Sequence, residues 1–505
     1  MIHDILFWNP SFMTLTDQLF FRFLIVLLIL YYSIGKKFQK FILLAASFFF
    51  YVTSAGVSLH KLAAVVIFVS GVAYAGSIII DKSSGKFRKI MTWICVTALV
   101  SCLFFLKTAY NVFSQILENP GSVAFMKFLP LIGLSYYTLS AIGYILDVSW
   151  GIYHADKNPL NVALYVIFFP QLVSGPVTRY SQMGDQIRAY HPLEYENIAY
   201  GLRRMIWGYF KKLVISERFA VIVSIIYGDY GNYNGAYLVF ATLCYAVQLY
   251  TDFSGCMDII MGAANLFGYS LPENFDAPFF SLSLKEFWRR WHITLGTWFK
   301  DYVMYPLQMS GVMNRLGKAC TKSFGKKRGK KIPFYVSMFV LWVLIGLWHG
   351  GTAHYFIASG MIPFVLLTLS DLMPSWLSLN YDSALCRVIC RFRTVLLMCV
   401  SFVFICAGSV SKALAVYGRI FTGFAAPITA KLPLTEYLSS TDITVMIAGL
   451  CVVLFADFLQ DKKTSFTAMI DRQKPIVQYC AIYAEILAVM FLGMVGSSSF
   501  IYFQF

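Results

Sequence analysis

Long apolar runs recur along almost the whole of this 505-residue chain and constrain its fold more than any other feature. A helix needs about 20 apolar residues to cross the roughly 30 Å of hydrocarbon in a bilayer. Runs that approach this length lie at 17–35, 41–59, 61–80, 91–110, 126–149, 205–227, 236–257, 333–349, 354–373, 393–410, 443–460 and 476–497. The chain is 58% hydrophobic and 13% charged, against roughly 45–50% and 25% in soluble domains. We therefore expect an all-α integral membrane protein that crosses the bilayer about a dozen times.

Two segments are expected to differ from simple crossings. Residues 161–178 are apolar but are interrupted by Pro170, Gly175 and Pro176, which favours a re-entrant or interfacial segment enclosed by protein or water. The stretch Met1–Phe12 lacks the basic start of a cleaved signal peptide, so the first apolar run is expected to remain as a true span. Because no repeat, low-complexity segment or long linker divides the chain, we predict a single polytopic domain over residues 1–505.

The charge distribution indicates a membrane partner and argues against nucleic acid. The formal net charge is +16, but the basic residues fall in short loops at alternate ends of the predicted spans, as the positive-inside rule requires. Lys36, Lys37 and Lys40 place the first loop in the cytoplasm, and the densest basic run, Lys322 to Lys331, falls on the same side. That run is interpreted as topogenic charge facing anionic lipid, with a specific docking site as the alternative. We expect a multi-pass protein of the cytoplasmic (inner) cell membrane.

The eleven cysteines are scattered mainly through apolar stretches. They form no CxxC pair and no zinc-ligand spacing, so they are interpreted as small core hydrophobes. We predict no metal site.

Two histidines in tryptophan-rich surroundings are the main candidates for chemistry. His292 ends the run Trp288-Arg289-Arg290-Trp291-His292, and His349 lies in Trp348-His349-Gly350. An imidazole in apolar surroundings needs a partner or a task, and its unperturbed pKa of about 6.5 suits proton transfer near neutral pH. The two histidines therefore indicate chemistry at the membrane.

The stretch 272–306 is amphipathic and is not expected to cross the bilayer. On one continuous helix, Trp288, Trp291, Leu295 and Trp298 would share a face, with the two arginines at its flank. Aromatic residues and arginines together suit the membrane interface, so a purely anchoring helix is an open alternative here.

Several sequence blocks, in order, resemble the membrane-bound O-acyltransferase (MBOAT) family, and most of all its branch of alginate O-acetylation membrane proteins. The blocks are LPLIGLSYYTLSAIGYILDVSWG at Leu129–Gly151, FFPQLVSGPVTR at Phe168–Arg179, YTDFSGCMD at Tyr250–Asp258, the stretch Pro272–Pro306, GLWHG at Gly346–Gly350 and FIYFQF at Phe500–Phe505.

The resemblance implies a ring of about 11–12 tilted transmembrane helices around a central funnel or tunnel, with re-entrant and interfacial helices. It also implies that His349 and His292 are the catalytic candidates, and that the fold brings them together across 57 residues of sequence. The substrate-binding candidates are Trp348, Asp252, Asn274, Arg289, Arg290, Trp291 and Trp288.

Two departures from the branch leave the acyl group open. Gly350 is followed by Gly351-Thr352-Ala353-His354-Tyr355, which is more like the related D-alanine transfer protein of teichoic acid modification. The residues after Pro306-Leu307 are Gln308-Met309-Ser310-Gly311 in place of the usual Gly-Gly-Asn-Arg. Acetyl transfer is the main expectation, and D-alanyl transfer from a carrier protein is the alternative.

The chemistry that the family implies is attack of a hydroxyl on an acyl thioester, such as acetyl-CoA, with no bound cofactor. The expected acceptor is a cell-surface or exported polysaccharide, or a partner acyltransferase that completes the transfer outside. A hydroxyl is a weak nucleophile until a base takes its proton. His349 is the predicted base, because burial in an apolar helix favours the neutral imidazole.

The other polar candidates keep more than one interpretation. His292 could act directly, position a substrate or be mainly structural, and His354 is interpreted as a helix-end or interfacial residue. Asp252 is expected to form a structural salt bridge, with an arginine of the central segment as its suggested partner. Asn274 could cap or line a tunnel mouth. Two other classes also stay open at this stage, namely a proton-coupled transporter or flippase, and a bis-histidine haem protein.

Overall fold

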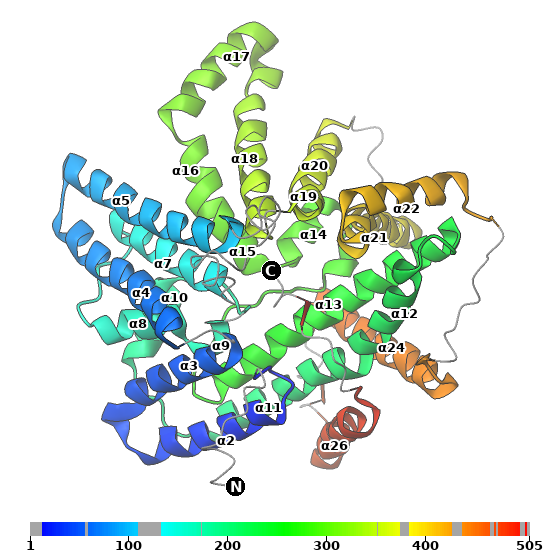
Figure 1. Cartoon of the computed structure of the whole chain (residues 1–505), viewed down its shortest axis with the longest axis horizontal. Helices are drawn as coiled ribbons and strands as arrows, with labels where there is room; N and C mark the ends of the chain where they lie inside the picture. Colours follow the sequence, from blue (N-terminus) through cyan, green and yellow to red (C-terminus); the bar gives the residue numbers. More distant parts are fainter. Residues whose placement is uncertain are drawn as a thin grey trace, which may run out of the picture. The chain divides into compact units, whose positions relative to one another are not determined.

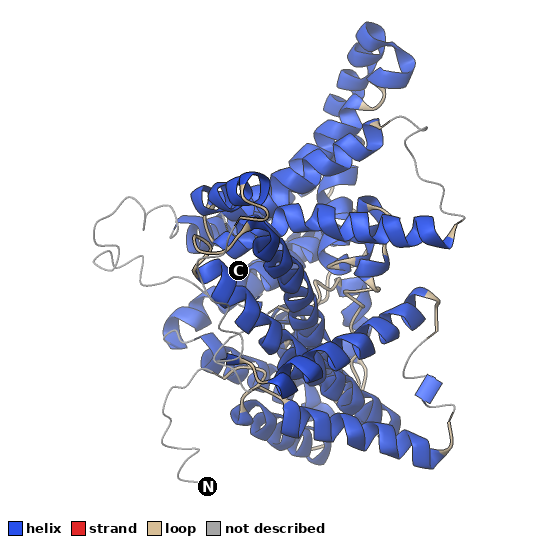
Figure 2. Cartoon of the chain, turned by 90° about the vertical axis from the view of Figure 1, so that its right-hand side faces the viewer, coloured by secondary structure: helices blue, strands red, loops and turns tan. Residues whose placement is uncertain are grey.

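The computed structural model is built from helices, as Figure 2 shows. It describes residues 13–55, 59–109, 133–172, 174–350, 352–373, 383–426, 437–464, 469–470, 473–494 and 500–501. Within these ranges there is no β-strand, and the one bridge of strand type joins Phe275 to Trp291. The predictions for residues 1–12, for the start of the run at 126–149 and for the tail beyond residue 501 lie outside the described residues.

Each of the twelve apolar runs is helical over most of its described residues, which confirms an all-α membrane protein. Among the described residues, six helical stretches are long and apolar enough to cross a membrane: Leu62–Lys82, Gly85–Leu106, Ala353–Leu372, Ala384–Ala407, Ser440–Asp461 and Pro475–Leu492. A seventh is added if the bent pair Gly311–Gly329 and Ile332–Trp348 counts as one span. The protein is therefore multi-pass, while the ring of about 11–12 helices around a tunnel stays a prediction.

Residue contacts group the chain into two compact units. The first contains Met1–Met205, Cys256–Pro272 and Ser499–Phe505, and the second contains Ile206–Gly255 and Glu273–Ser498. The single domain over 1–505 stays a prediction.

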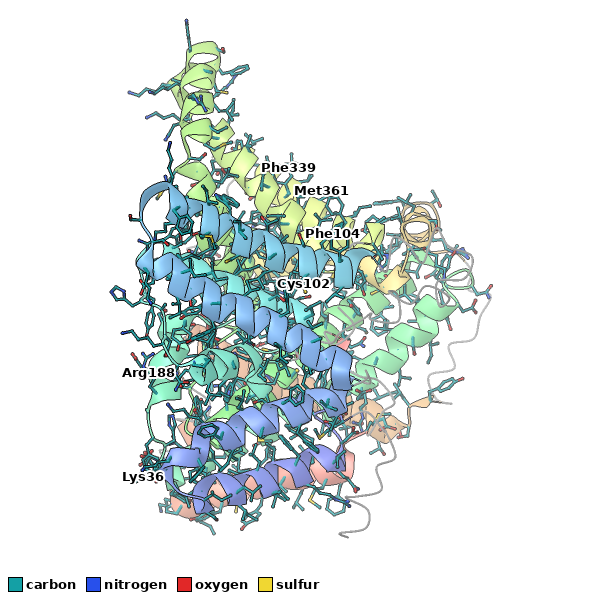
Figure 3. All side chains as sticks on the ribbon, turned by 60° about the vertical axis from the view of Figure 1, so that its left-hand side comes forward. Lys36, Cys102, Phe104, Arg188, Phe339 and Met361 are labelled. Carbon is teal, nitrogen blue, oxygen red and sulfur yellow. The ribbon has the colours of Figure 1, made fainter. Side chains whose placement is uncertain are left out.

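The first unit consists of helices of 3 to 24 residues, which Figure 1 shows in blue through cyan to green. They are α2 (Gln18–Ser33), η1 (Lys36–Phe38), α3 (Gln39–Ala55), α4 (Leu59–Lys82), α5 (Gly85–Leu103), η2 (Phe104–Ala109), α7 (Leu134–Ser149), α8 (Pro159–Ile167), α9 (Phe169–Leu172), α10 (Tyr180–Arg188) and most of α11 (Tyr195–Tyr209). In Figure 3, α4 and α5 lie side by side, with Cys102 near the end of α5 and Phe104 just beyond it.

The predicted interruption at 161–178 is confirmed in this unit. The segment forms two short helices, α8 and α9, whose side chains are almost all buried. Gly175 follows them so closely that an added Cβ would lie 2.3 Å from the Cα of Gln171. Because only glycine avoids this clash, the sequence directs a tight turn immediately after α9.

The second unit carries the two candidate histidines. Its elements are the end of α11, η5 (Phe210–Ser216), α12 (Glu217–Gly228), α13 (Gly235–Asn265) up to Gly255, η6 (Pro278–Phe280), α14 (Leu284–Arg290), α15 (Ile293–Phe299), η7 (Lys300–Met304), α16 (Tyr305–Gln308), α17 (Gly311–Gly329), α18 (Ile332–Trp348), α19 (Ala353–Phe356), η8 (Ile357–Met361), α20 (Ile362–Leu372), α21 (Ala384–Ala407), α22 (Val410–Thr422), α24 (Ser440–Asp461) and α26 (Pro475–Leu492).

The single helix predicted to carry Trp288, Trp291, Leu295 and Trp298 on one face is wrong. Helix α14 ends at Arg290 and α15 starts at Ile293, with His292 between them in the left-handed conformation (φ 46°). The reason is tertiary, because the chain at 290–293 pairs with an extended segment at 274–276. Asp276 donates its backbone N–H to the carbonyl of Arg290, and Ile293 donates to the carbonyl of Asn274.

The purely anchoring interpretation of this stretch also fails for three of its four apolar residues. Trp291, Leu295 and Trp298 are 5%, 3% and 5% exposed. Side chains enclosed by protein in this way cannot serve as contacts to the lipid interface, so this stretch contributes to the interior of the unit.

Candidate active site

His349 is placed by the end of an apolar helix. Helix α18 begins with Pro333 in its first turn and runs to Trp348, so that His349 is its C-cap residue and is 8% exposed. The next residue, Gly350, has φ +142°, a conformation that side chains disfavour. The sequence Trp-His-Gly thus ends the helix and leaves the imidazole in the interior.

The tautomer of His349 follows from its hydrogen bond. Its Nδ1 lies 2.9 Å from the carbonyl oxygen of Ile345, one helical turn earlier. A carbonyl only accepts, so Nδ1 carries the proton and donates it. In the neutral ring the lone pair then resides on Nε2, which is the atom able to accept a proton from a substrate.

His292 is held in a different way, by hydrogen bonds to the Asn274 side chain, which join two segments of the chain. The Asn274 Oδ1 accepts from His292 Nδ1 at 3.2 Å, from the Thr294 backbone N–H at 3.0 Å and from Thr294 Oγ1 at 2.9 Å. Together with the Ile293-to-Asn274 backbone bond, these contacts stabilise the left-handed conformation of His292. Such a conformation costs a non-glycine residue about 1–2 kcal/mol unless its surroundings fix it.

Both histidines therefore present the same nitrogen. Because Nδ1 of His292 donates to an amide oxygen, its lone pair is also on Nε2. Burial holds the pKa of His292 well below its ordinary value, and the nearby His349 acts in the same direction. His292 is thus neutral throughout the physiological pH range.

The fold brings the two histidines to one place, as the resemblance predicts. The Trp348 ring lies 4.9 Å from the His349 ring and 6.2 Å from the His292 ring, in edge-on geometry with both. The His292 ring also lies 4.8 Å from the Phe253 ring, at nearly a right angle to it. All the residues of this cluster belong to the second unit.

Trp288 and Trp291 pack against other aromatic residues of the second unit. Trp291 packs edge-on against Phe275 at 5.1 Å and stacks on Phe287 at 5.5 Å. Trp288 is half-buried against Trp342 of α18, with ring centres 4.9 Å apart. Through these contacts the segment that carries His292 packs on the helix that leads to His349. Direct substrate contacts by either tryptophan stay a prediction.

Asp252 forms the expected buried salt bridge, but the suggested arginine partner is wrong. Its Oδ1 lies 2.6 Å from Nζ of Lys212, which also lies 2.6 Å from Glu217 Oε1. The three side chains are 6% exposed or less. Lys212 reaches Asp252 from the π-helical segment η5, a place that the pattern of apolar residues does not indicate.

The two arginines of the central segment have different surroundings. Arg290 forms ion pairs with Glu286 at 2.6 Å and Asp461 at 2.8 Å, so carboxylates of the protein occupy its guanidinium. Asp461 in turn pairs with Arg391 at 2.9 Å. Arg289 is exposed. The ion pairs make Arg290 a tie between α14 and the end of α24, and anion binding by Arg289 stays a prediction.

Sequence reasoning missed three components of the cluster. Thr294 donates to the Asn274 oxygen that holds His292, the Ile345 carbonyl sets the tautomer of His349, and Lys212 pairs with Asp252. Thr294 could have been considered because it lies two residues after His292. The contact between His349 and Ile345 could have been expected because the two residues are four positions apart on one helix. For Lys212 the signal was a Lys-Lys pair inside an apolar run, which is unusual because buried ammonium groups require partners. His354 lies in the first turn of α19, in agreement with its interpretation as a helix-end residue.

These features define a pair of buried, oriented imidazoles in a polytopic helical membrane protein. Residues 153–318 match the membrane-bound O-acyltransferase family. The chain belongs to this family.

The chain is also similar to several named proteins. The probable alginate O-acetylase AlgI of Pseudomonas aeruginosa is 32% identical over 345 residues, which is 67% of this chain and 62% of that protein. The Pseudomonas putida AlgI is 27% identical, with 96% of this chain and 98% of that protein aligned. The teichoic acid D-alanyltransferase of Bacillus subtilis is 28% identical over 55% of this chain and 68% of its own length. The match to the first of these relatives thus spans less than two thirds of that relative's length.

Proposed function

We propose that this protein is an acyltransferase that moves an acyl group, acetyl in the first instance, from a cytosolic thioester to a hydroxyl of a cell-surface or exported polysaccharide. The observation that carries the proposal is His349, a buried imidazole whose Nδ1–H is fixed on a backbone carbonyl and whose Nε2 bears the lone pair. The names of the alginate O-acetylase relatives support acetyl as the group and a polysaccharide as the acceptor.

In the first step His349 acts as the general base. As the acceptor oxygen bonds to the thioester carbonyl carbon, its proton passes to Nε2, and the carbonyl oxygen becomes an oxyanion. General-base catalysis of this kind contributes about 10²- to 10⁴-fold in rate. The resulting imidazolium keeps its Nδ1–H bond to Ile345, so the charged ring is held in the same orientation as the neutral one.

In the second step the tetrahedral intermediate collapses. The carbon–sulfur bond breaks, the ester carbonyl re-forms, and the departing sulfur takes the proton from Nε2 of His349. The enzyme returns to its starting state with one thioester consumed, and one ester and one thiol formed. No cofactor needs to remain bound.

His292 is assigned a positioning role in this proposal. Its burial and lowered pKa make it a poor proton carrier, while its fixed Nε2 can accept a hydrogen bond from a substrate group. Asn274 orients His292 from the other side. The Lys212–Asp252 pair supports it indirectly, because Asp252 precedes Phe253, which packs on the imidazole.

The test is a pair of measurements on His349→Ala. Surface polymer from cells that express this variant should lose its ester-linked acyl group, at a protein level equal to that of wild type. The purified variant should also lose thioester cleavage that depends on an added acceptor. Retained acylation in a well-expressed variant would overturn the assignment.

D-alanyl transfer is the second candidate, and it is favoured by His354-Tyr355 and by the D-alanyltransferase relative. The two rings lie 4.4 Å apart at the start of α19, just beyond Gly350. Mass spectrometry of surface polymer from deletion and wild-type cells separates the candidates, because loss of 42 mass units per site, about one acetyl group, excludes alanine.

Location and partners complete the proposal. The basic cytoplasmic loops support residence in the cytoplasmic membrane, where the donor thioester is available. A partner acyltransferase outside the membrane would then receive the group where the polymer is exported. Fractionation of cells that express the tagged full-length protein checks the membrane, and affinity purification after crosslinking checks the partner.

A further inference from the structure

Helix α17 and the turn after it concentrate positive charge and contain no acidic residue of their own. Residues 311–331 contain no Asp and no Glu. Their basic residues are Arg315, Lys318, Lys322, Lys326, Lys327, Arg328, Lys330 and Lys331. All eight are exposed, and Figure 3 shows side chains projecting away from this light-green ribbon. We call residues 311–331 the basic arm.

The basic arm has two distinct faces. Arg315, Lys318 and Lys322 recur at i, i+3 and i+7 and therefore share one side of α17. Val312, Leu316, Cys320 and Phe324 recur every four residues and form an apolar stripe on another side. Val312 and Phe324 are 58% and 62% exposed, although they are apolar. This pattern of a basic face beside an exposed apolar face is typical of helices that lie in a membrane interface.

The orientation of α17 relative to α18 also fits a position in the membrane interface. Helix α18 is strongly apolar and continues to His349, and α17 meets it at 88° across a break of two residues. If α18 crosses the bilayer, α17 lies along its surface, and Figure 1 shows α17 adjoining the upper end of α18. Lys331, at the junction, pairs with Asp371 at the end of the span Ala353–Leu372, at 2.7 Å.

Two glycines fold the chain so that the basic residues of the arm lie close together. Gly325 has φ +77°, which reverses the chain after Phe324. Gly329 then returns so close to α17 that an added Cβ would lie 2.4 Å from the backbone of Thr321. The cluster Lys326–Lys331 is thereby folded back beside Lys322, so the charges reinforce one another at a single site.

We propose that the basic arm binds the acidic phospholipid headgroups of one leaflet. Its apolar stripe enters the boundary between headgroups and acyl chains, and its basic face contacts the phosphates. The occupant follows from charge complementarity together with the exposed apolar stripe, since an acidic soluble partner would leave Val312 and Phe324 without an apolar medium. Each basic residue near an acidic surface strengthens binding about fivefold.

The test uses the full-length protein in mild detergent and compares three forms. These are wild type, the arm variant K322Q/K326Q/K327Q and the control variant K82Q/K86Q/K89Q, which removes three exposed lysines around the α4–α5 turn. Native mass spectrometry measures retained phosphatidylglycerol and phosphatidylcholine. Wild type and the control variant should prefer phosphatidylglycerol, and the arm variant should bind it on the order of 10- to 100-fold more weakly. The preference should also decrease with salt.

Further variants separate charge from folding. K322R/K326R/K327R should restore the preference, and Phe324→Ser should weaken retention of both lipids. Unfolding midpoints should be equal in all forms. Equal phosphatidylglycerol binding by wild type and the arm variant overturns the proposal, as does an equal loss in the control variant. If the arm variant keeps its lipid but loses capture by an acidic acyl-carrier protein, the surface is a protein-docking site and the proposal is wrong. None of these measurements depends on acyl transfer.

Discussion

The two histidines are fixed in the interior by opposite means. His349 is held by its own helix, through a bond from Nδ1 to a carbonyl four residues earlier. His292 is held by a residue 18 positions away, Asn274, in a break between two short helices. Local geometry sets the first imidazole, whereas a tertiary crossing sets the second.

This difference teaches which histidine tolerates a change of charge. When His349 gains a proton, its Nδ1–H bond is unchanged and a backbone dipole still faces the ring. His292 sits edge-on to Phe253 and Trp348 in a fully buried place, so an added charge there has little compensation. A group that cycles its charge belongs at His349, and a group that orients a substrate belongs at His292.

The largest expected effect compares the two alanine variants. His349→Ala should lower kcat by about 10²- to 10⁴-fold, because the general base is lost. His292→Ala should lower kcat less and raise KM, because a positioning bond is lost. Steady-state kinetics on the purified proteins measure both. Equal losses in kcat would show that both imidazoles transfer protons and would erase the distinction.

The next largest effect concerns the buried ion pairs of Lys212 with Asp252 and Glu217. Lys212→Met leaves Asp252 and Glu217 buried without their ammonium partner, which should cost about 3–5 kcal/mol of stability. Lys86→Met, at an exposed site, should change stability by less than about 0.5 kcal/mol. Thermal unfolding in detergent measures both. A Lys212→Met protein as stable as wild type would show that the carboxylates are neutralised in another way.

Asn274 offers a way to alter His292 alone. Asn274→Ala removes the acceptor of three hydrogen bonds and should cost about 1–3 kcal/mol. Asn274→Asp keeps an acceptor but adds a negative charge, which favours imidazolium. The pKa of His292 is lowered in the native protein, so the ring is neutral at pH 6–8; the aspartate should raise that pKa.

The pH–rate profile then tests this assignment. In Asn274→Asp the imidazolium form of His292 persists to higher pH, so the acidic limb of the profile should move toward neutral pH, with activity regained as pH rises. Wild type should show no such limb from His292. An identical acidic limb in both proteins would contradict a role for neutral His292.

The smallest expected effect concerns the turn at Gly350, which directly follows His349. Gly350→Ala forces a side chain into φ +142°, which should cost about 1–3 kcal/mol and displace the imidazole. Gly311→Ala, where a Cβ meets nothing within 4 Å, is the matched control and should be neutral or slightly stabilising. Unfolding midpoints and kcat check both. If Gly350→Ala keeps full activity, the turn after α18 does not set the geometry of His349.

The parts of the site that could be predicted depend on residues close together in the sequence, and the other parts depend on residues far apart in the sequence. The helix ending in Trp348-His349-Gly350 could be predicted, since apolar composition and one glycine act within a few residues. The break at His292 could not, because the tryptophan spacing at 288, 291, 295 and 298 satisfies a continuous helix, and only Asn274 makes the alternative more stable. The partner of Asp252 was likewise decided by a lysine 40 positions earlier.

The sequence by itself determined that the chain is an all-α membrane protein of the O-acyltransferase family, because hydropathy and contiguous motifs are local properties. Only the tertiary structure decided the states of the site. It oriented the His292 imidazole with Nε2 as the acceptor, placed Trp348 against both histidines and chose Lys212 for Asp252. The physical reason is that burial of a polar group demands a partner, and which partner is within reach depends on how distant segments cross.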